Sequence, residues 1–130
     1  MILIDTHVVV WLAFEPDRIS LKARSAIVDA RANAEGLAIS DISLLELATL
    51  ASKGRIRLGM SAEAFLQEVE SSFVVLPMSG RACARAIGLP AKFPKDPADR
   101  IIAATALAEG MSLITADREI RRSKVVRTIW

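Results

Sequence analysis

The sequence predicts an α/β protein built on a parallel sheet, and two patterns carry that prediction. Residues 2–4 form an unbroken apolar run, which is typical of a strand buried on both faces of a parallel sheet. Short runs of this kind then alternate with helical patterns, as βαβ units require. The 130 residues match the usual size of one domain, so we expect a single domain over 1–130.

Capping and breaking residues set the expected helix bounds. Thr6 can cap the first helix, which Glu15-Pro16-Asp17 ends, and Ser20 can cap the second. Asp96, Pro97 and Gly110 mark the start and stop of the last long helix. The expected helices are 6–14, 20–34, 40–52, 61–71, 79–87 and 96–108, with a short turn or helix over 118–122. The expected strands are 2–4, 37–39, 73–76, 112–115 and 125–128.

The composition is that of a globular protein, with 52% hydrophobic and 25% charged residues. No run of eighteen apolar residues predicts a membrane span, and the start lacks the features of a signal peptide. We therefore expect a cytoplasmic protein without membrane contact. The single cysteine, Cys83, is expected to be a small buried residue, since the only histidine, His7, leaves a catalytic thiol without an evident base.

The charge is unevenly distributed, although the net charge is only +2. Residues 81–130 hold ten Lys or Arg against five Asp or Glu. Such a surface suits a phosphate-bearing partner, and a solvated basic face explains the charge equally well.

Four carboxylates occupy corresponding places in the predicted units. Asp5 follows the first strand, and Glu46 lies on the helix after the second strand. Asp99 begins the helix before the fourth strand, and Asp117 follows that strand. In parallel α/β units, strand ends and helix starts meet at one edge of the sheet, so we expect these acids to converge.

Converging carboxylates repel one another, and some take up protons unless a cation neutralises them. Oxygen ligands without a Cys or His cluster select Mg²⁺ or Mn²⁺ over zinc. A metal held in this way lowers the pKa of a water molecule and offsets charge on a phosphate. The pattern therefore predicts metal-dependent hydrolysis of a phosphodiester.

Each acid also has a purely structural interpretation. Asp96 and Asp99 fit the first turn of a helix, where the helix dipole favours acids. Asp117 can be a turn or cap residue, whereas Glu46 on a nearly all-apolar helix has the weakest structural explanation. His7 is better explained as a partly buried helix residue than as a ligand or base.

At these residues the sequence resembles the PIN-domain family, and within it the VapC toxins. The matching motifs are Ile2-Leu-Ile-Asp-Thr-His-Val-Val-Val-Trp-Leu12, Ser40-x-x-Ser-x-x-Glu-Leu47, Asp96-Pro-Ala-Asp-Arg-Ile-Ile-Ala-Ala-Thr-Ala106 and Leu113-Ile-Thr-Ala-Asp117. Their order and spacing match over the whole chain, which makes the four together specific.

The resemblance implies a three-layer α/β/α sandwich with a central parallel sheet of four to five strands. It also implies a Mg²⁺- or Mn²⁺-dependent endoribonuclease, neutralised as a toxin by a VapB-like antitoxin and commonly homodimeric. By matching position, Asp5, Glu46, Asp99 and Asp117 form the acidic quartet. Asp96 and Thr115 are secondary candidates, Thr115 as a hydroxyl that supports the metal site.

Other function classes remain open on the residues alone. A non-catalytic scaffold could bind RNA or a partner, and a phosphatase or DNA nuclease could use the same carboxylates. The sequence has no dinucleotide-binding glycine motif, no Walker A loop and no nucleophile elbow, so dinucleotide oxidoreductases, P-loop NTPases and nucleophile-elbow hydrolases are unsupported.

For RNA, the candidate cations are Lys92, Lys95, Arg100, Arg118, Arg121 and Arg122. For the antitoxin, we expect an apolar arm over Trp11 and Leu50.

Overall fold

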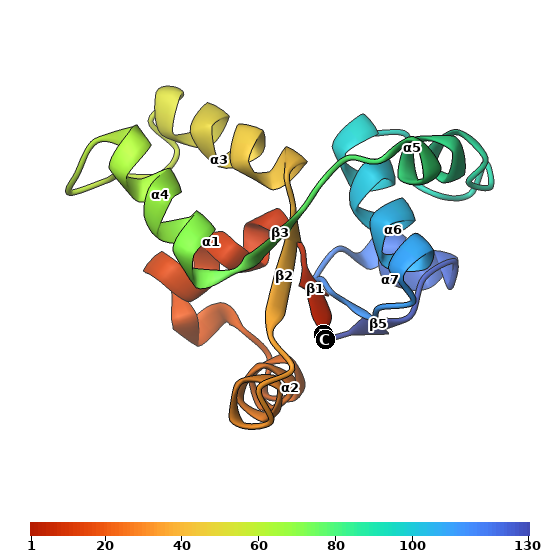
Figure 1. The fold of residues 1–130 in the computed structure, drawn as a ribbon, viewed down its shortest axis with the longest axis horizontal. Helices are drawn as coiled ribbons and strands as arrows, with labels where there is room; N and C mark the ends of the chain where they lie inside the picture. Colours follow the sequence, from red (N-terminus) through yellow and green to blue (C-terminus); the bar gives the residue numbers. More distant parts are fainter.

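The structure is a computed structural model that describes residues 1–130. A five-stranded, all-parallel sheet in the order β3-β2-β1-β4-β5 forms its centre (Figure 1). The strands are β1 (Ile2–Ile4), β2 (Leu37–Ser40), β3 (Val74–Leu76), β4 (Leu113–Ile114) and β5 (Thr128–Ile129). The helices are α1 (Thr6–Phe14), η1 (Pro16–Arg18), α2 (Leu21–Ala32), α3 (Ile42–Ser52), α4 (Ala62–Ser72), α5 (Gly80–Ile87), α6 (Pro97–Glu109) and α7 (Arg118–Ser123).

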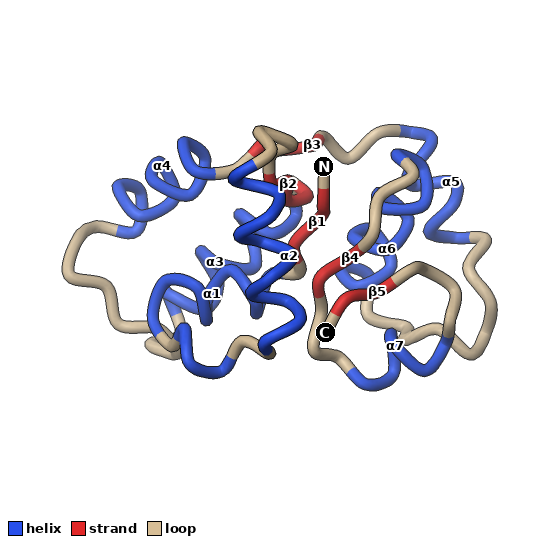
Figure 2. The backbone as a smooth tube through the Cα atoms, turned by 90° about the horizontal axis from the view of Figure 1, so that it is seen from below, coloured by secondary structure: helices blue, strands red, loops and turns tan.

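Helices cover both faces of this sheet, which confirms the predicted three-layer α/β/α architecture (Figures 1 and 2). Successive strand residues point to opposite faces. Leu3 packs into a cluster with α6 and α7, while Ile4 packs into a larger cluster with α1 to α4. Both side chains are fully buried, which explains why the opening strand is an unbroken apolar run.

The order of the strands places the first strand in the middle. β1 pairs with β2 through Ile2 and Leu37, and with β4 through Leu3 and Leu113. The carboxyl ends of β1 and β4 therefore lie side by side. The loops that leave these two strands begin α1 and lead to α7, and this edge of the sheet carries the site described below.

The last strand differs from its prediction. Residues 125–128 were expected to form it, but β5 spans only Thr128–Ile129. Helix α7 ends at Lys124 in a left-handed conformation, and the chain needs the following residues to return to the sheet. Val126 is buried because it packs against the second cluster, not because it belongs to a strand.

Two further features bear on the expectations. Cys83 on α5 is only half-buried, not fully buried as expected, because it lies on the flank of α5 between the core and the solvent. None of the helices combines the length and apolar character needed to cross a bilayer.

Truncating Ile102 to Ala should lower the free energy of unfolding by about 2–5 kcal/mol, because the side chain is 1% exposed and its loss leaves a cavity. Urea denaturation measures the change. Ile87→Ala is the matched control, because Ile87 is 87% exposed and its truncation should leave stability nearly unchanged. Equal losses in both variants would contradict this account of the core.

Candidate active site

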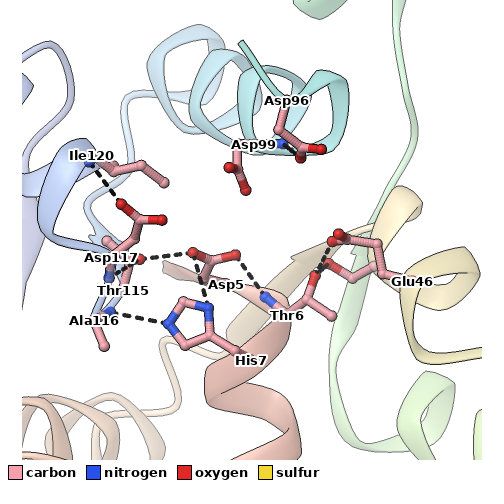
Figure 3. Close-up of polar contacts among 11 residues, drawn as sticks. Asp5, Thr6, His7, Glu46, Asp96, Asp99, Thr115, Ala116, Asp117 and Ile120 are labelled. Atoms are coloured by element: carbon pink, nitrogen blue, oxygen red, sulfur yellow. Dashed lines mark hydrogen bonds and ion pairs between the residues drawn. The ribbon is translucent and has the colours of Figure 1, made fainter. Parts of the chain in front are cut away.

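Carboxylates from four parts of the chain face a common space at the sheet edge (Figure 3). Asp5 follows β1 directly, and Asp117 lies just beyond β4. Asp99 comes from the first turn of α6, and Glu46 comes from the second turn of α3. The structure thus brings together all four acids that the sequence predicts as a quartet.

Asp5 is the most enclosed of these acids, with 3% of the residue exposed. Its Oδ1 accepts a hydrogen bond from the Thr6 backbone N–H at 2.8 Å. Its Oδ2 accepts a hydrogen bond from the Thr115 hydroxyl at 2.7 Å. These two donors fix the rotamer of the carboxylate.

Thr115 connects two of the acids. Its buried hydroxyl donates to Asp5 and accepts a hydrogen bond from the backbone N–H of Asp117 at 3.1 Å. Both of the hydroxyl's strong hydrogen-bonding roles are therefore used inside the site. The position of Asp117 relative to Asp5 depends on this single side chain.

His7 lies against the same oxygen of Asp5 that accepts from Thr115. Its Nε2 accepts a hydrogen bond from the Ala116 backbone N–H at 3.2 Å, so in the neutral ring the proton resides on Nδ1. That Nδ1 lies 3.5 Å from Asp5 Oδ2. His7 therefore orients Asp5 and joins it to the loop after β4, a contact that sequence reasoning did not find.

Thr6 is a further residue that the sequence analysis missed. Its Oγ1 donates to Glu46 Oε1 and lies 2.8 Å from Ser43 Oγ. Burial raises the pKa of Glu46, the hydrogen bond from Thr6 opposes that rise, and the negative charges of Asp5 and Asp96 add to it. Thr6 thus holds a carboxylate that its surroundings make costly to ionise.

Asp99 shows most clearly that the acids share one environment. Burial, the largest cause, and the negative charges of Asp5, Asp96, Asp117 and Glu46 together raise its pKa from 3.8 to about 7. Four separate carboxylates influence this one group, and the mutual repulsion is what a bound cation would relieve.

Asp96 and Asp117 also cap helices, as their structural interpretation predicted. Asp96 Oδ2 accepts from the Asp99 backbone N–H at 3.0 Å, and Asp117 Oδ1 accepts from Ile120 N–H at 3.0 Å. Asp5 is likewise the N-cap of α1. Three helix N-termini therefore point toward this edge, and their dipoles favour negative charge there.

An open cavity of about 730 Å³ adjoins the acids. Asp5, Glu46, Asp96 and Asp99 line one end of it. The remaining wall combines apolar side chains, among them Trp11, Leu45, Leu50 and Ile56, with polar and charged ones, among them Glu15, Arg18, Lys53 and Arg55. The Arg18 guanidinium lies 4.2 Å from the centroid of the Trp11 ring, and Trp11 packs against Trp130 at 5.7 Å.

The cations expected to hold RNA fall into two groups. Lys92, Lys95 and Arg118 are exposed, and none of them forms an ion pair. Arg100 is half-buried and donates to the backbone carbonyls of Ala86 and Phe93, each at 3.2 Å, and of Leu89 at 3.4 Å. Arg100 thus holds the α5–α6 connection together, and this use of its donors argues against a role in RNA binding.

The donor set of this site fits a hard divalent cation. The available ligands are carboxylate and hydroxyl oxygens, which Mg²⁺ and Mn²⁺ prefer. No three acidic, His or Cys side chains are close enough to form a finished metal cage. Mg²⁺ does not require one, because it usually keeps several waters and takes only one or two carboxylates.

The Asp99→Asn substitution should flatten the pH dependence of stability in the metal-free protein. The folded state raises the pKa of Asp99 from 3.8 to about 7, so folding favours its protonated form. The parent therefore loses stability as pH rises between these values, and the loss is complete above pH 7. Urea denaturation in EDTA across this range should show a smaller slope for the variant and greater stability at pH 8.

Asp29→Asn serves as the control for this comparison, because Asp29 is exposed on α2 and lies outside the cavity. It should keep the slope of the parent. An Asp99→Asn protein with the parent's full slope would show that the acids do not interact as described.

The chain resembles known proteins in sequence and in fold. The PIN domain family model matches residues 2–125. Ribonuclease VapC22 of Mycobacterium tuberculosis is 39% identical over 131 residues, which cover 99% of this chain and 98% of that protein.

Two solved structures share the fold. The structure of VapBC2 from Rickettsia felis bound to a DNA fragment from its promoter aligns with a TM-score of 0.73 at 21% identity, covering 98% of this chain and 97% of that one. DNA-bound VapBC from Salmonella typhimurium aligns with a TM-score of 0.69 at 24% identity, with the same coverage. On the family match and the identity to VapC22, the chain belongs to the PIN-domain family.

Proposed function

We propose that this protein is a metal-dependent endoribonuclease and the toxin of a type II toxin–antitoxin pair. The convergence of Asp5, Glu46, Asp99 and Asp117 beside one open cavity carries the proposal. The relative with 39% identity is named a ribonuclease, which supports RNA as the substrate. We expect this activity in the cytoplasm.

Asp5 and Asp99 are the residues proposed to hold Mg²⁺ or Mn²⁺ most directly, with Glu46 and Asp117 acting directly or through water. When bound, the metal supplies Lewis-acid stabilisation of the phosphate and a water of lowered pKa. The chain's own part is to keep the carboxylates in place. Thr115 and His7 orient Asp5, and Thr6 orients Glu46.

The Asp5→Asn substitution should lower the rate of RNA cleavage by at least about 100-fold, because it removes a carboxylate proposed to hold the metal. A bound metal stabilises the charge of the transition state by several kcal/mol. Asn has nearly the shape of Asp and still offers an acceptor to Thr6 N–H, so the variant should remain folded. Cleavage of labelled RNA with Mg²⁺ is the measurement, and circular dichroism checks the fold.

The controls for this experiment separate the competing functions. Asp29→Asn, on the exposed side of α2, should cleave like the parent. EDTA should abolish cleavage by the parent. RNA, DNA of the same sequence and a small phosphate ester are compared as substrates. Preference for DNA or the ester would contradict the ribonuclease proposal, and absence of all cleavage would favour a non-catalytic scaffold.

We further propose that a VapB-like antitoxin covers the apolar wall of the cavity with an apolar segment, and that the toxin is a homodimer. The structural neighbours from Rickettsia felis and Salmonella typhimurium are VapBC complexes, which supports an antitoxin partner. Trp11 and Leu50 were expected to lie under the antitoxin, and both line this cavity together with the exposed Leu45. Without the antitoxin, we expect the chain to be poorly soluble.

Leu45→Asp should weaken antitoxin binding by about tenfold or more, because a charge would enter the apolar contact. Leu45 is 64% exposed, so the free protein should fold normally. Leu21→Asp is the matched control, since Leu21 is 83% exposed on α2 and lies outside the cavity. Affinity measured by titration calorimetry should fall only for the first variant, and equal effects would place the antitoxin elsewhere.

A further inference from the structure

Helix α7 carries a hollow that is lined entirely by cations. Arg118, Arg121, Arg122 and Lys124 surround a space of about 380 Å³. None of them forms an ion pair, because the only pairs in the structure are Arg18 with Glu15 and His7 with Asp5. Four like charges on such a short segment, with Glu119 as the only acid in α7, repel one another, and an anionic ligand would relieve this repulsion.

Lys124 occupies this position in spite of its backbone conformation. Its φ is +55°, in the left-handed region that residues with a Cβ rarely adopt. Elsewhere the chain places glycine at such positions, as at Gly36, Gly54 and Gly110. Ala34 is the one other exception, and it carries no charge. Lys124 is the C-cap of α7, where a left-handed residue commonly ends a helix, and it adds a fourth cation beside the three arginines.

The position of α7 relates this hollow to the acids. Asp117 is the N-cap of α7, and Arg118 is the next residue (Figure 3). With a rise of 1.5 Å per residue, Lys124 lies about 10 Å further along the helix axis. The cations therefore begin at the edge of the acidic site and lead away from it.

The acidic site itself cannot attract a polyanion. Its carboxylates repel phosphate until a metal is bound, and even then each further phosphate of a strand meets negative charge. A nuclease with such a centre needs its binding energy for RNA from cations outside it. On α7 those cations form no ion pairs, and three of the four are exposed.

We propose that the α7 hollow, formed by Arg118, Arg121, Arg122 and Lys124, binds phosphates of the RNA strand that flanks the cleaved bond. This inference rests on the proposed ribonuclease function and assigns its substrate-docking surface. Arginine suits the role, because its planar guanidinium pairs with phosphate through two parallel hydrogen bonds. The ligand is the continuous backbone of a single strand, so recognition here is independent of base sequence.

The test uses RNA binding by the cleavage-deficient Asp5→Asn protein, with and without a second substitution. Lys124→Gly removes one charge and relieves the left-handed conformation, so its thermal stability should equal or exceed that of the parent. Its Kd for an RNA oligonucleotide should rise. Loss of one phosphate contact should lower the slope of log Kd against log salt by about 0.7. The factor by which Kd rises between 50 and 200 mM salt should therefore be about threefold smaller for the variant than for the parent.

Matched controls isolate the charge from the backbone. Ala34→Gly relieves a left-handed residue without changing charge, and it should leave the Kd and the salt slope unchanged. Lys22→Gln removes an exposed cation from α2 and should likewise have no effect. Arg122→Gln is a second variant within the hollow and should behave like Lys124→Gly even if the glycine variant folds poorly.

The outcomes distinguish this inference from the proposed function. If Asp5-containing protein cleaves RNA but Lys124→Gly and Arg122→Gln bind it with the parent's Kd and salt slope, the α7 assignment is wrong. If the two variants lose antitoxin affinity and keep RNA affinity, the hollow is a protein-docking surface and the assignment is again wrong. If the parent neither cleaves nor binds RNA, the proposed function itself fails.

Discussion

One hydrogen bond, from Thr115 to Asp5, holds the site together. It connects the ends of β1 and β4 across 110 residues of sequence. Because the Thr115 hydroxyl also accepts from the backbone N–H of Asp117, the same hydroxyl helps to position Asp117, the acid that follows β4. Replacing it with an apolar residue would leave buried polar groups without partners, which is more costly than the bond itself is stabilising.

The acids are held together by forces that have nothing to do with their own charges. Two apolar clusters, one on each face of the sheet, fix β1, β2 and β4. The carboxylates follow wherever those strands and the starts of α1, α6 and α7 place them. The raised pKa values of Glu46 and Asp99 show that burial and mutual repulsion both disfavour the charged forms at the positions where the fold places these groups.

Much of this arrangement could be predicted from the sequence, and particular residues show why. Asp5 and Asp117 follow apolar runs, so the rule for parallel strands places them at one edge. Thr6 and His7 could not be assigned, because their partners, Glu46 and Ala116, are distant in sequence and depend on how the helices pack. Arg100 was a candidate for RNA binding because a count of charges does not distinguish a free cation from one that donates hydrogen bonds to backbone carbonyls, as Arg100 does.

The central position of β1 has a consequence for synthesis of the chain. Strand β1 is translated before β4, with which it later pairs. Asp5 therefore emerges from the ribosome long before Thr115 and Asp117, and long before Ala116, whose backbone N–H binds His7. A nascent chain that stops before this segment has Asp5, Glu46 and Asp99, but it lacks Asp117 and the end of β4 beside β1. On the proposed function, toxicity would therefore begin only after the segment with Thr115, Ala116 and Asp117 has been translated.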